Sequence, residues 1–271
     1  MRVIVSLTTI PSRVAYLDKI LNCLRNQTYP IDKIYLNLPE DSRREGRPYP
    51  ELPTTLDLRG VKVVRCLDLG PITKIAPMLQ FENDPDTLIV TVDDDIEYAP
   101  TRIEELVYWS QRFPDSAIGG SGKIVGEWWN CFGYVRHVER PVPVSIIEGY
   151  SGCIYRRKFF TTDLLNYTGA PSGAFYNDDV WISGHLARKG IERLVHPNRS
   201  ALHNQRLPGA LSGEWANFLQ RFLPTVWHFK RQGLFNEPQL MPPNKTVGFW
   251  AALGILFLIL GGTWTYQKIS Q

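Results

Sequence analysis

The first 113 residues alternate between segments with the pattern of a β-strand and segments with the pattern of an α-helix. Runs of β-branched and other apolar residues predict strands at 2–7, 32–38, 61–67 and 88–92. Helical spacing of apolar residues predicts helices at 14–27, 74–81 and 101–113. In the first of these, Leu17, Ile20, Leu21 and Leu24 share one face. Such alternation is typical of an α/β sheet covered by helices on both faces.

The chain after Pro114 follows a looser pattern. Residues 116–129 and 141–157 indicate short strands and glycine loops, and residues 177–190 indicate a helix that ends before Gly190. Residues 213–233 indicate an amphipathic helix interrupted at Pro224. The sequence therefore predicts one folded domain over residues 1–235, followed by a linker over residues 236–246.

Residues 247–266 form a run of twenty residues without a charge. As a helix this run would be about 30 Å long, which matches the hydrocarbon thickness of a bilayer. Trp250 and Trp264 lie near its two ends, where interfacial aromatic residues are common. A buried core helix is the alternative, but we expect a single-pass membrane anchor because few soluble helices are apolar on every face.

The distribution of basic residues around this run predicts a cytosolic body. Four basic residues precede the run and one follows it, namely Arg221, Lys230, Arg231 and Lys245 before and Lys268 after. Four N-x-S/T sequons are a mild argument for the other side of the membrane, at Asn26, Asn166, Asn198 and Asn244.

Net charge and cysteine spacing exclude two classes of function. A formal net charge of +3, with no basic run interleaved with aromatic residues, gives no indication of nucleic-acid binding. The four cysteines have no C-x-x-C spacing, which argues against a zinc site and a small disulfide framework. We expect reduced, buried thiols at Cys23, Cys66, Cys131 and Cys153.

Three consecutive carboxylates, Asp93, Asp94 and Asp95, follow the predicted strand at 88–92. Ligands bind at the carboxyl ends of strands in open α/β sheets. On an extended backbone Asp93 and Asp95 would point to one side and Asp94 to the other, toward a basic or backbone group. Carboxylate oxygens suit Mg²⁺ or Mn²⁺, which also bind phosphate oxygens. A solvated acidic turn is the alternative, but we expect a cation site.

Several separate stretches resemble the GT-A fold glycosyltransferases, nearest to the family-2-like enzymes. The resemblance covers about residues 2–205 and rests on five stretches in the family's order. These are "VSLTTIPSRV" with "LRNQTYP" and "IYLNLP", then "DLGPITKIAP", "VDDDIEY" as a D-x-D motif, "EGYSGCIY", and "NDDVWISGHL" as an x-E-D helix start. The resemblance implies a Rossmann-like mixed sheet sandwiched by helices, in addition to the C-terminal transmembrane helix.

On the donor side, the resemblance implies a nucleotide pocket lined by Thr9, Pro11 and Arg13. Lys74 would face the two phosphates of the donor, although an exposed lysine at a helix start is the simpler interpretation of that residue alone. Asp95 would bind the metal directly, with Asp93 nearer the sugar, and Asp94 belongs to the same donor-binding set.

A late histidine is a further candidate metal ligand. His196 and His203 both qualify, and we prefer His203, with a purely structural role as the alternative.

On the acceptor side, the resemblance makes Asp179 the general base of an inverting transfer. Asp178 replaces the family's glutamate and is one methylene shorter. Helix capping is an equally simple interpretation of both aspartates, since they begin a predicted helix. The remaining candidates for acceptor or sugar binding are Trp128, Trp129, Gly149, Tyr150 and Gly152, for which core packing or turn formation is the alternative.

These expectations together predict a metal-dependent, inverting glycosyltransferase that uses Mn²⁺ or Mg²⁺. The donor would be a nucleotide-diphosphate sugar, UDP in preference to GDP, and the acceptor a hydroxyl on a glycan, lipid or protein. A metal-dependent phosphohydrolase and a non-catalytic glycan-binding membrane protein are the alternatives.

Overall fold

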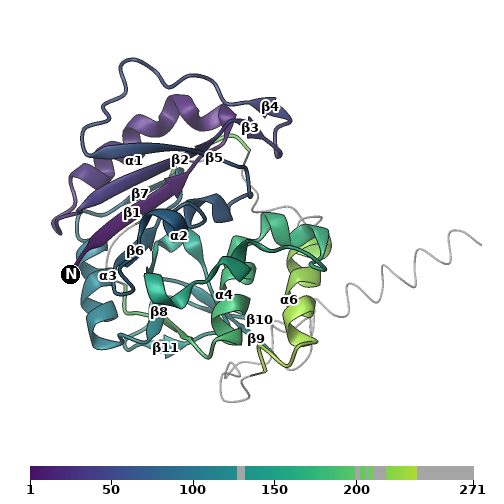
Figure 1. Ribbon diagram of the computed structural model, residues 1–271. Helices are drawn as coiled ribbons and strands as arrows, with labels where there is room; N and C mark the ends of the chain where they lie inside the picture. Colours follow the sequence, from purple (N-terminus) through teal and green to yellow (C-terminus); the bar gives the residue numbers. More distant parts are fainter. Residues whose placement is uncertain (127–131, 199–201, 206, 210–217, 237–271) are drawn as a thin grey trace, which may run out of the picture.

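The computed structural model describes residues 1–126, 132–198, 202–205, 207–209 and 218–236 (Figure 1). Its centre is an eight-stranded mixed sheet. The order of strands is β11 (Val142–Pro143), β14 (Glu192–Val195), β8 (Ser116–Gly119), β13 (Cys153–Arg156), β6 (Leu88–Thr91), β1 (Val3–Thr8), β2 (Lys33–Pro39) and β5 (Val61–Cys66). This arrangement confirms the predicted α/β class, and the four strands predicted in the first 113 residues are all present.

The sheet changes direction in the middle. Strands β6, β1, β2 and β5 run parallel to one another, whereas β13 runs antiparallel to both β6 and β8. Because β13 enters between β6 and β8, the start of β13 lies at the same edge of the sheet as the end of β6, with Cys153 opposite Thr91. Segments on either side of residue 114 therefore meet at one edge.

Helices α1 (Leu17–Arg25) and α3 (Arg102–Arg112) pack on one face of the sheet. The predicted apolar face of α1 is confirmed, because its four leucine and isoleucine residues are at most 1% exposed. They pack with alternate residues of β1 and β2, such as Val5 and Leu36.

The opposite face carries α2 (Met78–Phe81), α4 (Asp178–Arg188) and α6 (Leu223–Lys230). Figure 1 shows α4 and α6 side by side, and Trp181 of α4 lies 5.4 Å from Phe229 of α6 between ring centroids. The predicted helix over 177–190 is confirmed, with Gly190 beyond its end at a φ of 69°. Pro224 lies in the first turn of α6, where its missing N–H costs no hydrogen bond.

Two predicted helices begin differently from the expectation. The helix predicted over 14–27 starts as a 3₁₀ helix, η1 (Pro11–Tyr16), before α1. The helix predicted over 74–81 is wrong as one element, because it consists of the 3₁₀ turn η2 (Ile72–Lys74) and the short α2. Pro77 lies between η2 and α2. A proline disfavours the helical conformation in the residue before it, which explains why the two elements are separate.

Smaller strand pairs complete the fold. They are β3 (Asp41–Ser42) with β4 (Arg47–Pro48), β7 (Ile96–Tyr98) with β15 (Leu202–Asn204), and β9 (Gly122–Val125) with β10 (Phe132–Val135) and β12 (Ile146–Ile147). Cys23, Cys66 and Cys153 are free thiols, and only Cys153 is fully buried; Cys131 lies outside the described residues.

In the part of the chain that the structure describes, no helix has the length and apolar character needed to cross a membrane. The predicted anchor, 247–266, and the linker beyond Asn236 lie outside the described residues. The domain boundaries and the membrane anchor therefore remain predictions.

The packing of α1 on the sheet generates a stability prediction. Leu21 is fully buried between α1 and the sheet, so Leu21→Ala removes apolar contacts and leaves a cavity. We expect the free energy of unfolding to fall by about 2–5 kcal/mol. Urea unfolding followed by circular dichroism measures the change. Lys19→Ala, on the exposed side of the same helix, is the control and should change it by less than about 0.5 kcal/mol. Equal losses in the two variants would contradict this packing.

Candidate active site

The candidate site lies where the chain changes direction across the sheet. Strand β1 pairs with β2 on one side and with β6 on the other, with Ser6 opposite both Tyr35 and Thr91. Connections therefore leave the adjacent carboxyl ends of β1 and β6 in opposite directions, and such a point leaves a crevice for ligands. Thr9 follows β1 and Asp93 follows β6, so these two predicted donor-side residues lie at this switch point of the sheet.

The three aspartates after β6 do not continue the strand. Asp94 and Asp95 lie in a turn that leads into β7. The expectation of an extended D-x-D segment with Asp93 and Asp95 on one side is therefore wrong. The N–H of Asp93 donates a hydrogen bond to the hydroxyl of Tyr98, five residues further along the chain, at 2.9 Å. This bond stabilises the turn.

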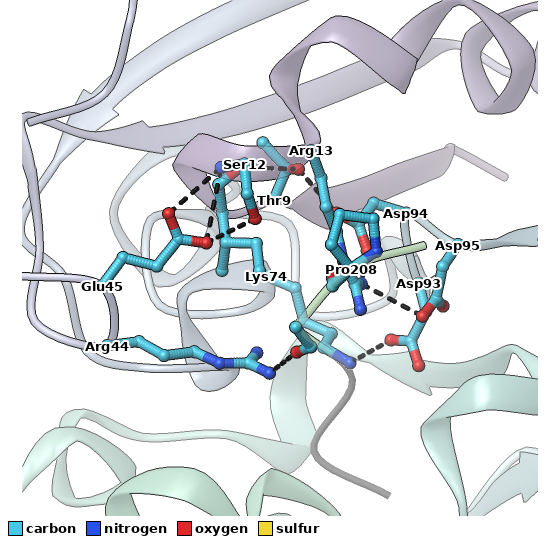
Figure 2. A network of polar contacts seen from close by, with 12 residues as sticks. Thr9, Ser12, Arg13, Arg44, Glu45, Lys74, Asp93, Asp94, Asp95 and Pro208 are labelled. Atoms are coloured by element: carbon cyan, nitrogen blue, oxygen red, sulfur yellow. Dashed lines mark hydrogen bonds and ion pairs between the residues drawn. The ribbon is translucent and has the colours of Figure 1, made fainter. Parts of the chain in front are cut away.

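The three aspartates share two basic partners, Lys74 and Arg13, as Figure 2 shows. Asp93 accepts a hydrogen bond from Nζ of Lys74 at 2.6 Å. Asp94 is buried and accepts hydrogen bonds from the Thr9 hydroxyl at 2.5 Å and from the Arg13 guanidinium at 2.7 Å. Asp95 forms an ion pair with the same guanidinium at 3.0 Å. The expectation that Asp94 turns toward a basic group is confirmed.

Arg13 connects this acidic turn to a distant part of the chain. Pro11 begins the 3₁₀ helix η1, which turns Arg13 inward, where it is 7% exposed. Besides its two carboxylate contacts, its Nε donates to the carbonyl of Pro208 at 2.7 Å. Residues after β1, after β6 and after β15 therefore converge on one guanidinium.

Lys74 joins the two halves of the site. Its Nζ lies 2.6 Å from a carboxylate oxygen of Asp93 and 2.9 Å from one of Asp178. The side chain is 6% exposed, so the alternative of an exposed lysine at a helix start is wrong. Burial lowers the pKa of Lys74, but the carboxylates of Asp178, Asp93 and Asp179 together raise it well above its ordinary value. The residue therefore stays charged in the interior.

Asp178 and Asp179 open helix α4, yet neither acts as its cap. The N-cap is Asn177, and no side chain caps the helix. Oδ1 of Asp179 instead accepts the N–H of Gly149 at 2.8 Å. A Cβ on Gly149 would lie 3.0 Å from that oxygen and 3.3 Å from Nζ of Lys74, so glycine permits the close approach. Burial, with Asp178 nearby, raises the pKa of Asp179 well above its ordinary value.

The loop before β13 connects to the acidic turn through Tyr98. Its hydroxyl accepts from the N–H of Asp93 and donates to the carbonyl of Tyr150 at 3.1 Å. Gly152 follows with a φ of 77°, a conformation that favours glycine. Tyr98 was missed as a site residue, although a buried tyrosine shortly after an acidic turn is a recognisable signal. Trp128 and Trp129 lie outside the described residues.

The two candidate histidines differ in their surroundings. His196 is fully buried, packs near Trp109, and its Nδ1 lies 2.8 Å from the carbonyl of Pro197. Burial lowers its pKa to about 4, as expected of a structural residue. His203 is exposed on β15, opposite Glu97. Among the described residues, no group of three or more histidine, cysteine, aspartate or glutamate side chains is arranged to hold a metal ion.

Asp93 and Asp95 nevertheless fit a divalent cation that has further ligands from a bound substrate. Their side chains are 29% and 17% exposed, so their oxygens are accessible. Burial raises the pKa of Asp95, and repulsion from the carboxylates of Asp93 and Asp94 raises it further. The positive charge of Arg13 acts in the opposite direction. A cation bound at the turn would offset the repulsion between these carboxylates. Mg²⁺ commonly binds one or two carboxylates and completes its shell with phosphates and water.

Comparison with known proteins bears on the fold. No protein-family model and no curated protein matches the sequence. Among solved structures, the chain resembles the crystal structure of GalNAc-T7 with UDP, GalNAc and Mn²⁺. The TM-score is 0.55 at 16% sequence identity, over 84% of this chain and 50% of that one. The chain has the GT-A fold.

The chain spans about half the length of that GT-A glycosyltransferase. A second similar structure is that of S. aureus TarS 1-349, with a TM-score of 0.43, 14% identity, and coverage of 72% of this chain and 58% of that one. The GT-A fold agrees with the architecture that the D-x-D and x-E-D-like stretches implied.

The raised pKa of Asp179 generates a pH prediction for protein kept in EDTA. Above the ordinary pKa of 3.8, the unfolded chain loses this proton before the folded chain does. The free energy of unfolding should therefore fall as pH rises toward the raised pKa. The amide oxygen in Asp179→Asn can still accept the hydrogen bond from the N–H of Gly149. Because the amide does not titrate, the stability of this variant should not fall with pH in the same way. Urea unfolding at about pH 5 and about pH 9 should show the variant gaining stability relative to the unmodified protein.

Asp18→Asn serves as the control, since Asp18 is an exposed carboxylate on α1. Its pH dependence should run parallel to that of the unmodified protein. If Asp179→Asn ran parallel as well, the buried carboxylate would not have the raised pKa.

Proposed function

We propose that the protein is a metal-dependent, inverting glycosyltransferase. It transfers a sugar from a nucleotide-diphosphate donor, UDP in preference to GDP, to a hydroxyl of a glycan, lipid or protein. The observation that carries this proposal is the convergence of two acidic groups, Asp93–Asp95 and Asp178–Asp179, on the buried Lys74 at the crevice of a GT-A fold. GalNAc-T7, which has the same fold, was crystallised with UDP, GalNAc and Mn²⁺.

The donor side consists of the loops after β1 and β6. Thr9 and Arg13 hold Asp94, and Pro11 sets the turn that directs Arg13 inward. Lys74 faces the donor phosphates while it keeps Asp93 in position. Asp95, with Asp93, would hold a Mn²⁺ or Mg²⁺ ion. That ion, when bound, offsets negative charge on the diphosphate leaving group. His203 remains a further candidate ligand.

The acceptor side consists of the loop before β13 and the start of α4. The acceptor hydroxyl lies against Gly149, Tyr150 and Gly152, with Trp128 and Trp129 as candidate sugar platforms. Asp179 takes the hydroxyl proton as the acceptor oxygen bonds to the anomeric carbon. The bond from that carbon to the diphosphate oxygen breaks, and its electron pair leaves with the diphosphate. A carboxylate with a raised pKa is a stronger base than a solvated one, which suits Asp179. Asp178 orients Lys74 beside it.

Substitution of the two acidic groups tests this assignment. With Mn²⁺ and a set of nucleotide sugars, release of nucleoside diphosphate should identify a donor. Asp179→Asn removes the base and should lower kcat by about 10²–10⁴-fold. Asp95→Asn should weaken metal-dependent donor binding. Asp18→Asn replaces an exposed carboxylate and should leave both kcat and donor binding unchanged.

Each other result of this experiment contradicts part of the assignment. If no donor is bound or turned over, the transferase proposal is wrong. Full activity in Asp179→Asn would exclude that residue as the base. Donor cleavage at full rate without any acceptor would favour a phosphohydrolase. If there is no turnover and Asp95→Ala still binds nucleotide and metal, a non-catalytic glycan-binding protein would be favoured.

We propose further that residues 247–266 anchor the enzyme in a membrane with its catalytic domain in the cytosol. The uncharged run and the basic residues before it support this arrangement. Removal of residues 247–271 should release the protein from the membrane fraction. Protease added to sealed cytosol-side-out vesicles should digest the domain of the full chain. Protection from protease, or glycosylation at Asn26 or Asn166, would place the domain on the lumenal side.

A further inference from the structure

Two arginines lie over the turn that leads into α4, and a third, Arg44, is close enough to Arg221 to be repelled by it. Arg43 and Arg44 lie in the β3–β4 hairpin loop, Arg221 lies in η7 (Phe218–Phe222), and the turn is η6 (Ser172–Tyr176). We call the three together the arginine subsite. Arg44 also borders the acidic turn, since it donates to the carbonyl of Gly209, next to the Pro208 carbonyl that Arg13 binds (Figure 2).

Two of the guanidinium groups lie over aromatic rings. Cζ of Arg43 lies 4.3 Å from the centroid of the Phe175 ring, and Cζ of Arg221 lies 4.2 Å from that of Tyr176. The two rings are neighbours in the turn, with centroids 5.0 Å apart. Stacking fixes the plane of a guanidinium and leaves its N–H edge available for hydrogen bonds. A stacked arginine is therefore partly organised for binding an anion.

Close backbone contacts hold this platform in place. A Cβ on Gly70 would overlap the carbonyl oxygen of Phe175, and a Cβ on Gly173 would overlap the backbone of Arg221. The η6 turn thus packs directly against the segment before η2 and against η7. The rings of Phe175 and Tyr176, over which Arg43 and Arg221 lie, therefore belong to a closely packed backbone turn.

The subsite has an excess of positive charge. Within the described ranges, no carboxylate forms an ion pair with Arg43, Arg44 or Arg221, whereas Arg13 has two carboxylate partners and Arg47 and Arg59 have one each. The carboxylates that act on Arg44 are Asp94 and Glu45, which are already paired with Arg13 and Arg47. Burial, together with repulsion from Arg13 and Arg221, lowers the pKa of Arg44. Its hydrogen-bond acceptor is the neutral carbonyl of Gly209.

The location of the subsite points to the acceptor. Tyr176 is two residues before Asp178, so the platform continues directly into the pair of carboxylates assigned to the acceptor side. The donor diphosphate already faces Lys74 and the cation that Asp93 and Asp95 would hold. Arg43 and Arg221 lie on the η6 rings, at the end of α4 that carries the proposed base.

We propose that Arg43, Arg44 and Arg221 bind a phosphate group that the acceptor carries close to its reacting hydroxyl. Guanidinium groups bind phosphate oxygens in pairs, and such charge-assisted hydrogen bonds are about twice as strong as neutral ones. This inference deepens the proposed function, since it rests on the assignment of the α4 side to the acceptor, and it restricts the acceptor to a phosphate ester.

Binding of glycerol 3-phosphate tests the proposal without turnover. The full chain in detergent is saturated with UDP and Mn²⁺, and binding of glycerol 3-phosphate and of uncharged glycerol is measured by calorimetry. Glycerol 3-phosphate should bind and glycerol should not. Arg43→Gln and Arg221→Gln should each weaken that binding by about tenfold, which corresponds to about 1.4 kcal/mol. Arg221→Lys keeps the charge and loses the paired geometry, so it should fall in between.

The affinity for UDP distinguishes the two phosphate sources. It should stay within about twofold of the unmodified value in each variant. Arg59→Gln removes a fully exposed arginine that is paired with Asp57, and should change neither affinity. If the variants lose UDP affinity and UDP-loaded protein binds no glycerol 3-phosphate, the arginines hold the donor diphosphate and the proposal is wrong. It is equally wrong if neither affinity depends on the arginines.

The two assignments fail separately. Protein that binds UDP through Asp95 but shows no arginine-dependent phosphate binding contradicts only the acceptor proposal. Protein that does not bind UDP at all contradicts the proposed function. The arginine variants then still report on glycerol 3-phosphate binding in the absence of nucleotide.

Discussion

The buried ammonium of Lys74 determines how the two halves of the site fit together. A charge removed from water is tolerated only with close partners of opposite charge, and Lys74 has Asp93 on one side and Asp178 on the other. Loss of one partner from a buried pair typically costs about 3–5 kcal/mol, because the remaining charge stays unpaired. Because Asp93 follows β6 and Asp178 begins α4, the ion pairs to the Lys74 ammonium fix the distance between these two elements. Gly149 completes the arrangement, since a Cβ at this position would crowd both the Asp179 carboxylate and the Lys74 ammonium.

Arg13 performs a comparable role for the acidic turn. It binds Asp94 and Asp95 together and also the carbonyl of Pro208, so a single side chain fixes three segments. Asp94 is fully committed to this task by its second bond, from Thr9. Asp93 and Asp95 are therefore the more accessible carboxylates of the three. Burial raises the pKa of Asp94, while the Arg13 guanidinium and the Thr9 hydroxyl favour its charged form.

Local pattern predicted the sheet and its helices because both depend on the periodicity of apolar residues. The buried face of α1 and the strand before Asp93 are examples. The errors lie where distant contacts decide the outcome. Lys74 alone suggests an exposed lysine, and only its packing against Asp178, about a hundred residues away, makes it a buried bridge. The acidic segment alone suggests an extended strand, but a hydrogen bond to Tyr98 turns it. Asp178 and Asp179 resemble helix caps, yet their partners are Lys74 and Gly149.

The insertion of β13 between β6 and β8 brings these distant groups together, and no periodicity along the chain encodes that insertion. It places the Gly149 loop beside Asp93, and Tyr98 then joins the two by a hydrogen bond at each end. One consequence is a separation of charge across the site. Carboxylates concentrate around Lys74, whereas Arg43 and Arg221, which form no ion pair with a described carboxylate, lie over the rings of Phe175 and Tyr176, just before α4. An uncharged acceptor would offer no anionic group for these arginines to bind. A phosphate ester would bind at the arginines and bring its hydroxyl to the carboxylates, so that the same charge distribution both binds and orients it.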